Sequence, residues 1–125
     1  MEKMKIFAML FVVFISLYAQ KSLDEATYNR GEMIYLSKGC SSCHGADAEG
    51  STTYPRLANK PKKYLIERIQ KFKSGKVDTV SEQMMAQFVE KLSKNQIEDL
   101  VYFLSHHKKP KESEVADDLL GGFGS

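Results

Sequence analysis

Cys40-Ser41-Ser42-Cys43-His44 is the most informative stretch of this 125-residue chain. It places two thiols about one helical turn apart and an imidazole directly after the second thiol. These are the only cysteines in the chain, so neither can pair with a third. A disulfide between them would close a very short loop and stabilise the fold little. The spacing therefore needs an explanation other than a structural disulfide.

The explanation that fits is the C-x-x-C-H pattern through which haem c is attached. Two thiols one turn apart can add to the two vinyl groups on one edge of a porphyrin. The histidine that follows can then reach the iron of the same ring. We therefore predict one covalently bound haem c, held through Cys40 and Cys43, with His44 as an iron ligand.

Two other readings of the motif are weaker. A structural zinc site needs four ligands, and the only other candidates are His106 and His107. A thioredoxin-like redox pair would lie within a βαβ pattern, which the sequence does not contain. Haem attachment is the interpretation that we keep.

The first 19 residues have the pattern of a secretory signal peptide. Lys3 and Lys5 precede an uncharged apolar run over residues 6–15, and Ala19 is a suitable residue for cleavage. The alternative is an uncleaved membrane anchor, but the run over residues 6–19 is shorter than the roughly 20 apolar residues that span a bilayer. We expect export to the periplasm and three parts: a signal peptide (1–19), a haem domain (20–107) and a flexible polar tail (108–125).

The charge of the mature chain excludes one class of partner. The whole chain has 18 Lys and Arg against 16 Asp and Glu, and removal of Glu2, Lys3 and Lys5 leaves them nearly balanced. Non-specific nucleic-acid binding depends on a strong positive field, so we do not expect it. Six lysines lie on and near the predicted second helix: Lys60, Lys62, Lys63, Lys71, Lys73 and Lys76. They could form a ring around the haem edge that steers an acidic partner, or an ordinary solvated helix face.

The rest of the pattern predicts an all-α fold, with three main helices and one or two short ones around one haem. The first helix covers residues 23–38, with Asp24 as its cap, and Gly31 on its apolar face suggests a close helix crossing. A loop covers residues 45–59. The expected later elements are a helix from Asn59 or Pro61 to Gly75, a short one within residues 81–91 around 87–89, and a last one from the Ser93-x-x-Gln96 capping box to near His107.

The order of these elements resembles the class I cytochrome c family over residues 26–105. Gly31 and Phe103 resemble the glycine and the aromatic residue where the first and last helices of that family cross. Pro55 resembles the proline whose carbonyl accepts a hydrogen bond from the ligand histidine. Met85, seven residues before Leu92, resembles the methionine iron ligand. The family often has proline just before that methionine, whereas this chain has Met84, which is the alternative ligand.

The resemblance implies a soluble, monomeric one-electron carrier and no enzyme. Histidine–methionine ligation fills both axial positions and raises the reduction potential relative to two histidines. The implied partners are a quinol-oxidising complex and a terminal oxidase or peroxidase. The rivals are a membrane-held haem subunit of a larger complex, retained by the signal or by the apolar segment 119–123, and a haem enzyme or gas sensor with an open iron site.

Four side chains carry smaller expectations. Arg56 is a candidate partner for a haem propionate. Met33 is expected in the core of the first helix. His106 and His107 are expected at the surface, with a role as second histidine ligand kept as an alternative.

Overall fold

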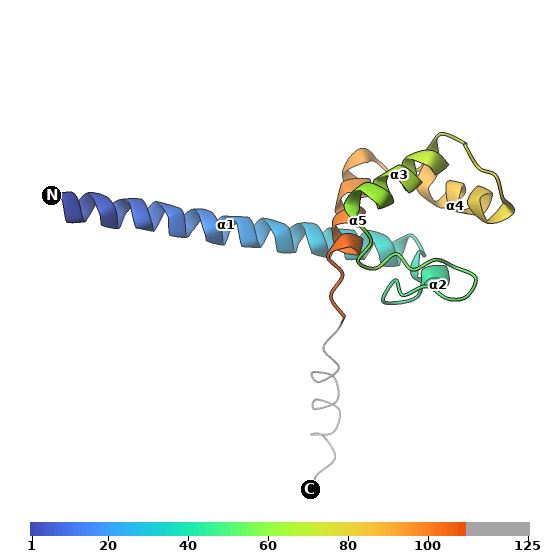
Figure 1. The fold of residues 1–125 in the computed structure, drawn as a ribbon, viewed down its shortest axis with the longest axis horizontal. Helices are drawn as coiled ribbons and strands as arrows, with labels where there is room; N and C mark the ends of the chain where they lie inside the picture. The colour runs from blue at the N-terminus through green and yellow to red at the C-terminus, as the bar shows by residue number, and fades with distance from the viewer. Residues whose placement is uncertain (110–125) are drawn as a thin grey trace, which may run out of the picture.

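The computed structural model describes residues 1–109, and this part of the chain is helical with no strand (Figure 1). The predicted all-α fold is confirmed. The apolar segment 119–123 lies outside the described residues. The helices are α1 (Glu2–Ser37), α2 (Ser41–His44), α3 (Lys62–Lys73), α4 (Val80–Glu90) and α5 (Lys94–Ser105).

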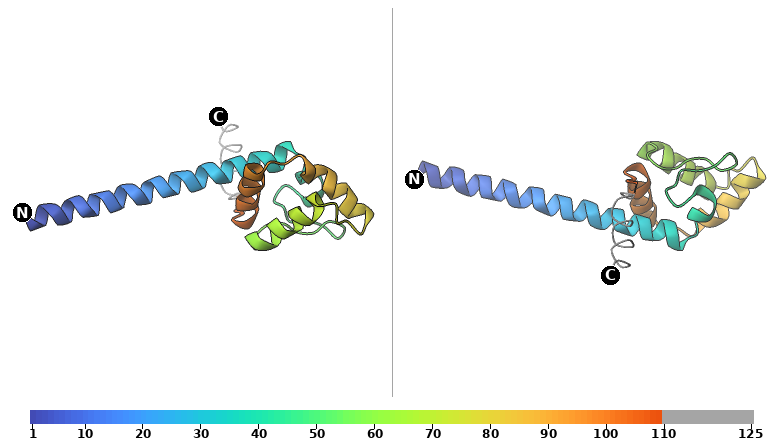
Figure 2. Two further views of the ribbon diagram at one scale, coloured as in Figure 1. Left: turned by 90° about the horizontal axis from the view of Figure 1, so that it is seen from above. Right: turned by 90° about the horizontal axis from the view of Figure 1, so that it is seen from below.

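Helix α1 is much longer than predicted, because it runs without a break through the apolar N-terminal segment. Asp24 therefore lies inside the helix and does not cap it. Residues 2–22 contain neither proline nor glycine, so nothing in their sequence stops the helix. The N-terminal half projects from the rest of the protein as a rod (Figures 1 and 2). By length and composition α1 could cross a membrane, a test that signal sequences also pass, so cleavage after Ala19 stays a prediction.

The C-terminal half of α1 crosses α5 at Gly31, as the sequence predicts. A Cβ atom added to Gly31 would lie 2.6 Å from the Cβ of Phe103 and closer still to the backbone carbonyl of Asp99. Phe103 is buried, and its ring centroid lies 5.5 Å from that of Tyr35. Arg30 closes the edge of the crossing through a 2.8 Å ion pair with Asp99. A glycine is required here because the two backbones touch.

Met33 does not lie in the core, and this expectation was wrong. Its side chain is 68% exposed. Two positions along a helix correspond to a rotation of about 200°, so Met33 faces away from the crossing at Gly31.

Helix α5 packs against α1, and α3 packs against both α5 and α4. Helix α3 ends at Lys73, close to the predicted boundary, and α5 begins with the predicted capping box. The Ser93 hydroxyl accepts from the Gln96 N–H at 3.2 Å, and the Gln96 side chain accepts from the Ser93 N–H at 3.0 Å. The inward residues of α3 and α5 are Leu65, Ile69, Phe72, Leu100, Val101, Phe103 and Leu104.

Helix α4 lies in the predicted segment 81–91 but is longer than the short helix expected around residues 87–89, because it begins at Val80. Thr79 caps it, and its hydroxyl accepts a 3.1 Å hydrogen bond from the Glu82 N–H. The sequence Thr79-Val80-Ser81-Glu82 has the form of a capping box, which is the signal that the prediction missed.

Candidate functional site

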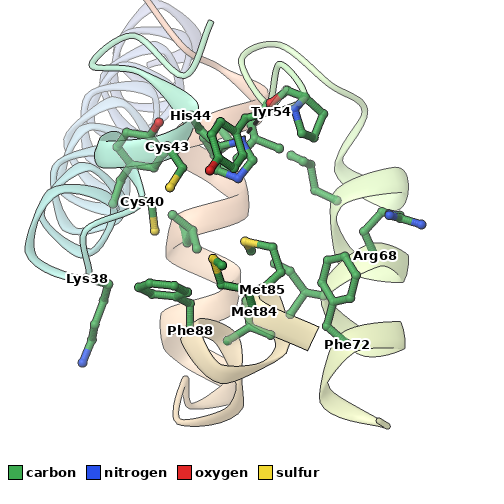
Figure 3. Close-up of a pocket in the computed structure, with 18 of the residues that line it drawn as sticks. Lys38, Cys40, Cys43, His44, Tyr54, Arg68, Phe72, Met84, Met85 and Phe88 are labelled. Atoms are coloured by element: carbon green, nitrogen blue, oxygen red, sulfur yellow. Dashed lines mark hydrogen bonds between the residues drawn. The ribbon is translucent and has the colours of Figure 1, made fainter. Parts of the chain in front are cut away.

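A cavity of about 310 Å³ lies where the end of α1, α2 and the loop meet α3, α4 and α5. This volume is at the lower end of the roughly 300–1,000 Å³ typical of sites for small molecules and cofactors. Cys40, Cys43 and His44 all line it (Figure 3). Its other walls are mainly apolar and include Tyr35, Leu57, Leu65, Ile69, Phe72, Met84, Met85, Phe88, Val89, Leu92, Leu100 and Leu104.

The two cysteines are unbonded thiols on the same wall of the cavity. Cys40 directly precedes the single helical turn α2 and Cys43 lies within it, and the His44 N–H donates to the Cys40 carbonyl at 3.0 Å. Burial raises the pKa of the Cys40 thiol above its usual value of 9.0, so this group is a neutral thiol at physiological pH.

His44 is only 4% exposed, and its two ring nitrogens have different surroundings. Its Nδ1 lies 2.8 Å from the carbonyl oxygen of Pro55. A carbonyl can only accept, so Nδ1 carries the proton in this contact and Nε2 keeps its lone pair. Nε2 is buried and has no hydrogen-bond partner among the described residues. This is the form of histidine that binds a metal, with its second nitrogen fixed by a hydrogen bond that raises ligand basicity.

The loop reaches this geometry because of Gly50, a residue within the predicted loop 45–59. The Gly50 N–H donates to the His44 carbonyl at 2.7 Å. A Cβ atom at Gly50 would lie 2.7 Å from the carbonyl carbon of Pro55, and its φ of +73° disfavours other residues. Gly50 therefore lets the chain turn back so that Pro55 meets the imidazole. The hydroxyl of Tyr35 holds the start of the loop by donating to the Gly45 carbonyl at 2.6 Å.

Met84 and Met85 both line the cavity on α4, across from His44 (Figure 3). Met84 is 48% exposed, whereas Met85 is partly buried and packs against the core. The greater burial supports Met85 over Met84 as the second ligand, which stays a prediction.

None of the six lysines considered above lines the cavity. Lys71 instead pairs with Glu82 at 3.0 Å and with Asp78 at 2.9 Å, and Lys73 donates to backbone carbonyls at the end of α4. Lys71 and Lys73 thus have partners within the protein, and a steering role for the other four lysines stays a prediction. The cationic side chains that do line the cavity are Lys38 and Arg68. Neither was predicted to be a site residue.

The other polar candidates lie away from the cavity. The Nε of Arg56 donates to the Ala58 carbonyl at 3.3 Å and Arg56 is not a lining residue, and its pairing with a propionate stays a prediction. His106 stacks on Tyr102 with ring centroids 4.3 Å apart. His107 is not at the surface as expected: its side chain is mostly buried, with Nε2 3.7 Å from a carboxylate oxygen of Asp47. Neither histidine is placed to serve as a second ligand.

In a comparison with known protein families, the cytochrome c family model matches residues 28–108. The chain belongs to the cytochrome c family. One relative is cytochrome c-552 of Acidithiobacillus ferridurans, 30% identical over 82 residues, which are 65% of this chain and 34% of the relative. Another is cytochrome c-555 of Methylococcus capsulatus (strain ATCC 33009 / NCIMB 11132 / Bath), 51% identical over 37 residues, which are 30% of this chain and 29% of the relative. The matched part of this cytochrome spans about a third of each of these curated relatives.

Membership of the family confirms the predicted cofactor, a covalently attached haem c. The residues of the cavity fit that group. Two thiols, a buried histidine with a free Nε2 and two methionines surround an apolar space. Buried polar atoms in proteins nearly always have a partner, so the orphaned Nε2 calls for a bound group at this position.

Proposed function

We propose that this cytochrome is a soluble periplasmic one-electron carrier with a single haem bound through Cys40 and Cys43 and ligated by His44 and Met85. The observation that carries the proposal is the buried Nε2 of His44, which is left without a partner in a cavity lined by both thiols and by Met85. The bound haem would supply an iron that exchanges one electron at a time. The protein residues would set its ligation, its surroundings and its access to water.

Each side of the cavity has a distinct role in this proposal. The Pro55 carbonyl orients the His44 ring and fixes the tautomer with the proton on Nδ1, which leaves Nε2 as the nitrogen for the iron. Met85 would hold the iron as a second protein ligand beside His44, which would leave no position for a substrate. The apolar walls exclude water and favour the state of the iron with the lower charge, which together with a thioether ligand raises the reduction potential. This arrangement favours outer-sphere electron transfer over catalysis.

Location and partners follow from the N-terminal segment and from the family. We expect cleavage after Ala19, a mature haem domain over residues 20–107 and a soluble monomer in the periplasm. The expected electron donor is a quinol-oxidising complex, and the expected acceptor is a terminal oxidase or peroxidase.

A membrane-held form is the second candidate, and one observation favours it. Helix α1 continues without a break from the apolar segment into the haem domain. The mass of the protein purified from membrane and soluble fractions distinguishes the two forms. A soluble protein that begins near Gln20 supports the carrier, whereas a full-length protein confined to membranes contradicts it.

The ligands are tested by visible spectroscopy of the holoprotein, oxidised and reduced, with and without carbon monoxide. We expect a low-spin spectrum, a weak far-red sulfur–iron band when oxidised, and no change with carbon monoxide when reduced. The Met85→Ala variant should lose the far-red band and bind carbon monoxide, whereas the Met84→Ala control should keep the wild-type behaviour. Loss of the band in Met84→Ala alone would transfer the ligand role to Met84. A high-spin wild-type spectrum that shifts with carbon monoxide would contradict the carrier and support an open-site enzyme or sensor.

A further inference from the structure

Helix α4 carries the proposed methionine ligand but has little apolar anchorage of its own. Val89 is its one buried residue, and α4 packs chiefly against α3. Val80 is exposed, and Met84 and Phe88 line the cavity, where only a bound haem would cover them. Within the protein itself, the position of Met85 therefore depends largely on polar contacts at the two ends of α4.

The C-terminal end of α4 is held by a single lysine of α3. Lys73 Nζ donates to the carbonyls of Glu90 and Leu92, each at 2.8 Å, and to that of Val89 at 3.4 Å. An ammonium group has three donors, and these contacts use all of them. The last carbonyls of a helix lack intrahelical partners and carry partial negative charge, so a cation is favourable there.

The N-terminal end of α4 is held by a carboxylate that faces α3. Glu82 is 16% exposed and accepts from Lys71 at 3.0 Å and from Arg68 at 3.1 Å. It also accepts from the backbone N–H of Asp78 at 2.9 Å. A carboxylate in the first helical turn interacts favourably with the helix dipole. Both ends of α4 are thus bonded to α3 by charge-assisted hydrogen bonds.

We propose that Lys73 and Glu82 are positioning residues that hold Met85 on the iron by fastening the two ends of α4 to α3. The inference rests on the proposed ligation by Met85, which lies between the two attachments. An external ligand can enter only when α4 moves Met85 away, and its apparent affinity is reduced by the rarity of that open state. Loss of either attachment makes the open state more frequent without removing a ligand.

The test is a titration of the oxidised holoprotein with imidazole, together with the far-red band and the helix content by circular dichroism. We expect Lys73→Met and Glu82→Gln to bind imidazole roughly tenfold more tightly, since each loses charge-assisted hydrogen bonds, and to show a weaker far-red band. Lys73→Arg keeps a cation with several donors and should recover most of the wild-type affinity. The matched controls are Lys63→Met and Glu67→Gln on α3, which lose one exposed pair with N–O distance 3.9 Å.

An affinity within twofold of the wild type in both Lys73→Met and Glu82→Gln would overturn the inference. Equal tightening in the control variants would also overturn it, because the effect would then reflect surface charge. If Lys73→Met loses its haem or its helix content, the imidazole affinities of Lys73→Gln and Glu82→Gln are judged by the same twofold limit. A wild-type protein with no far-red band contradicts ligation by methionine itself, so failure of the proposed function is recognised before any variant is measured.

Discussion

The two sides of the cavity are built by different means. On the histidine side, α1 crosses α5 in direct backbone contact, and Tyr35 and Pro55 hold the loop by short hydrogen bonds within the interior. On the methionine side, α4 is attached to α3 mainly by ionic groups near the surface. Interior packing resists displacement more strongly than surface ion pairs do. We infer that the histidine side is the permanent part of the site and the methionine side the adjustable part.

The largest expected effect comes from breaking the crossing of α1 and α5. Gly31→Val would force the Asp99 backbone and the Phe103 side chain apart, and we expect a loss of about 3 kcal/mol or more in the free energy of unfolding. Denaturant unfolding of the holoprotein measures this. The control is Met33→Ala on the exposed face of the same helix, for which a change within about 0.5 kcal/mol is expected. Similar losses in both variants would show that the crossing contributes nothing specific.

A smaller effect is expected when the loop is released from α1. Tyr35→Phe removes the hydroxyl and leaves the Gly45 carbonyl without this donor, which should cost about 1–3 kcal/mol in unfolding free energy. Burial raises the pKa of Tyr35 well above its usual 10.0, so the hydroxyl donates at any pH at which the protein is used. Tyr102→Phe, at a partly exposed position of α5, is the comparison. If Tyr35→Phe loses no more unfolding free energy than Tyr102→Phe, the hydrogen bond to Gly45 does not stabilise the histidine side.

The smallest expected effect is the pH dependence of the stability that Glu82 contributes on the methionine side. Hydrogen bonds from the Asp78 N–H, Lys71 and Arg68 lower the pKa of Glu82 from 4.5 to about 2. The stabilisation is therefore fully present above pH 4.5 and disappears as the pH falls towards 2. We expect Glu82→Gln to be less stable than the wild type at pH 7, with a difference that shrinks below pH 4.5. Unfolding measured at several pH values tests this, and a difference independent of pH would show that the carboxylate charge is irrelevant.

The features that the sequence predicted correctly depend on residues near one another or on strict steric demands. The spacing of Cys40, Cys43 and His44 is local, and so is the capping box at Ser93. The crossing at Gly31 could be predicted because only glycine permits such close approach. Pro55 came from the family resemblance, and the structure places its carbonyl at the His44 ring.

The features that the sequence did not predict depend on partners brought together by folding. The role of Lys73 depends on carbonyls at the end of another helix, and no pattern along α3 distinguishes it from Lys63. Glu82 fits a capping box in sequence, but its side chain turns to Asp78, Lys71 and Arg68. Gly50 resembled any loop glycine until the close approach of Pro55 gave it a specific role.

The unbroken course of α1 has a practical consequence for maturation of the protein. Cleavage after Ala19 would create a new helix end at Gln20, where the first four N–H groups lose their partners and the helix frays over about one turn. Gly31 lies 11 residues further along, on the order of three turns away. Such fraying would stop well short of the crossing with α5. The leader can therefore be exchanged for another without disturbing the haem domain, and protein exported behind a different leader should have the same unfolding curve and the same spectrum.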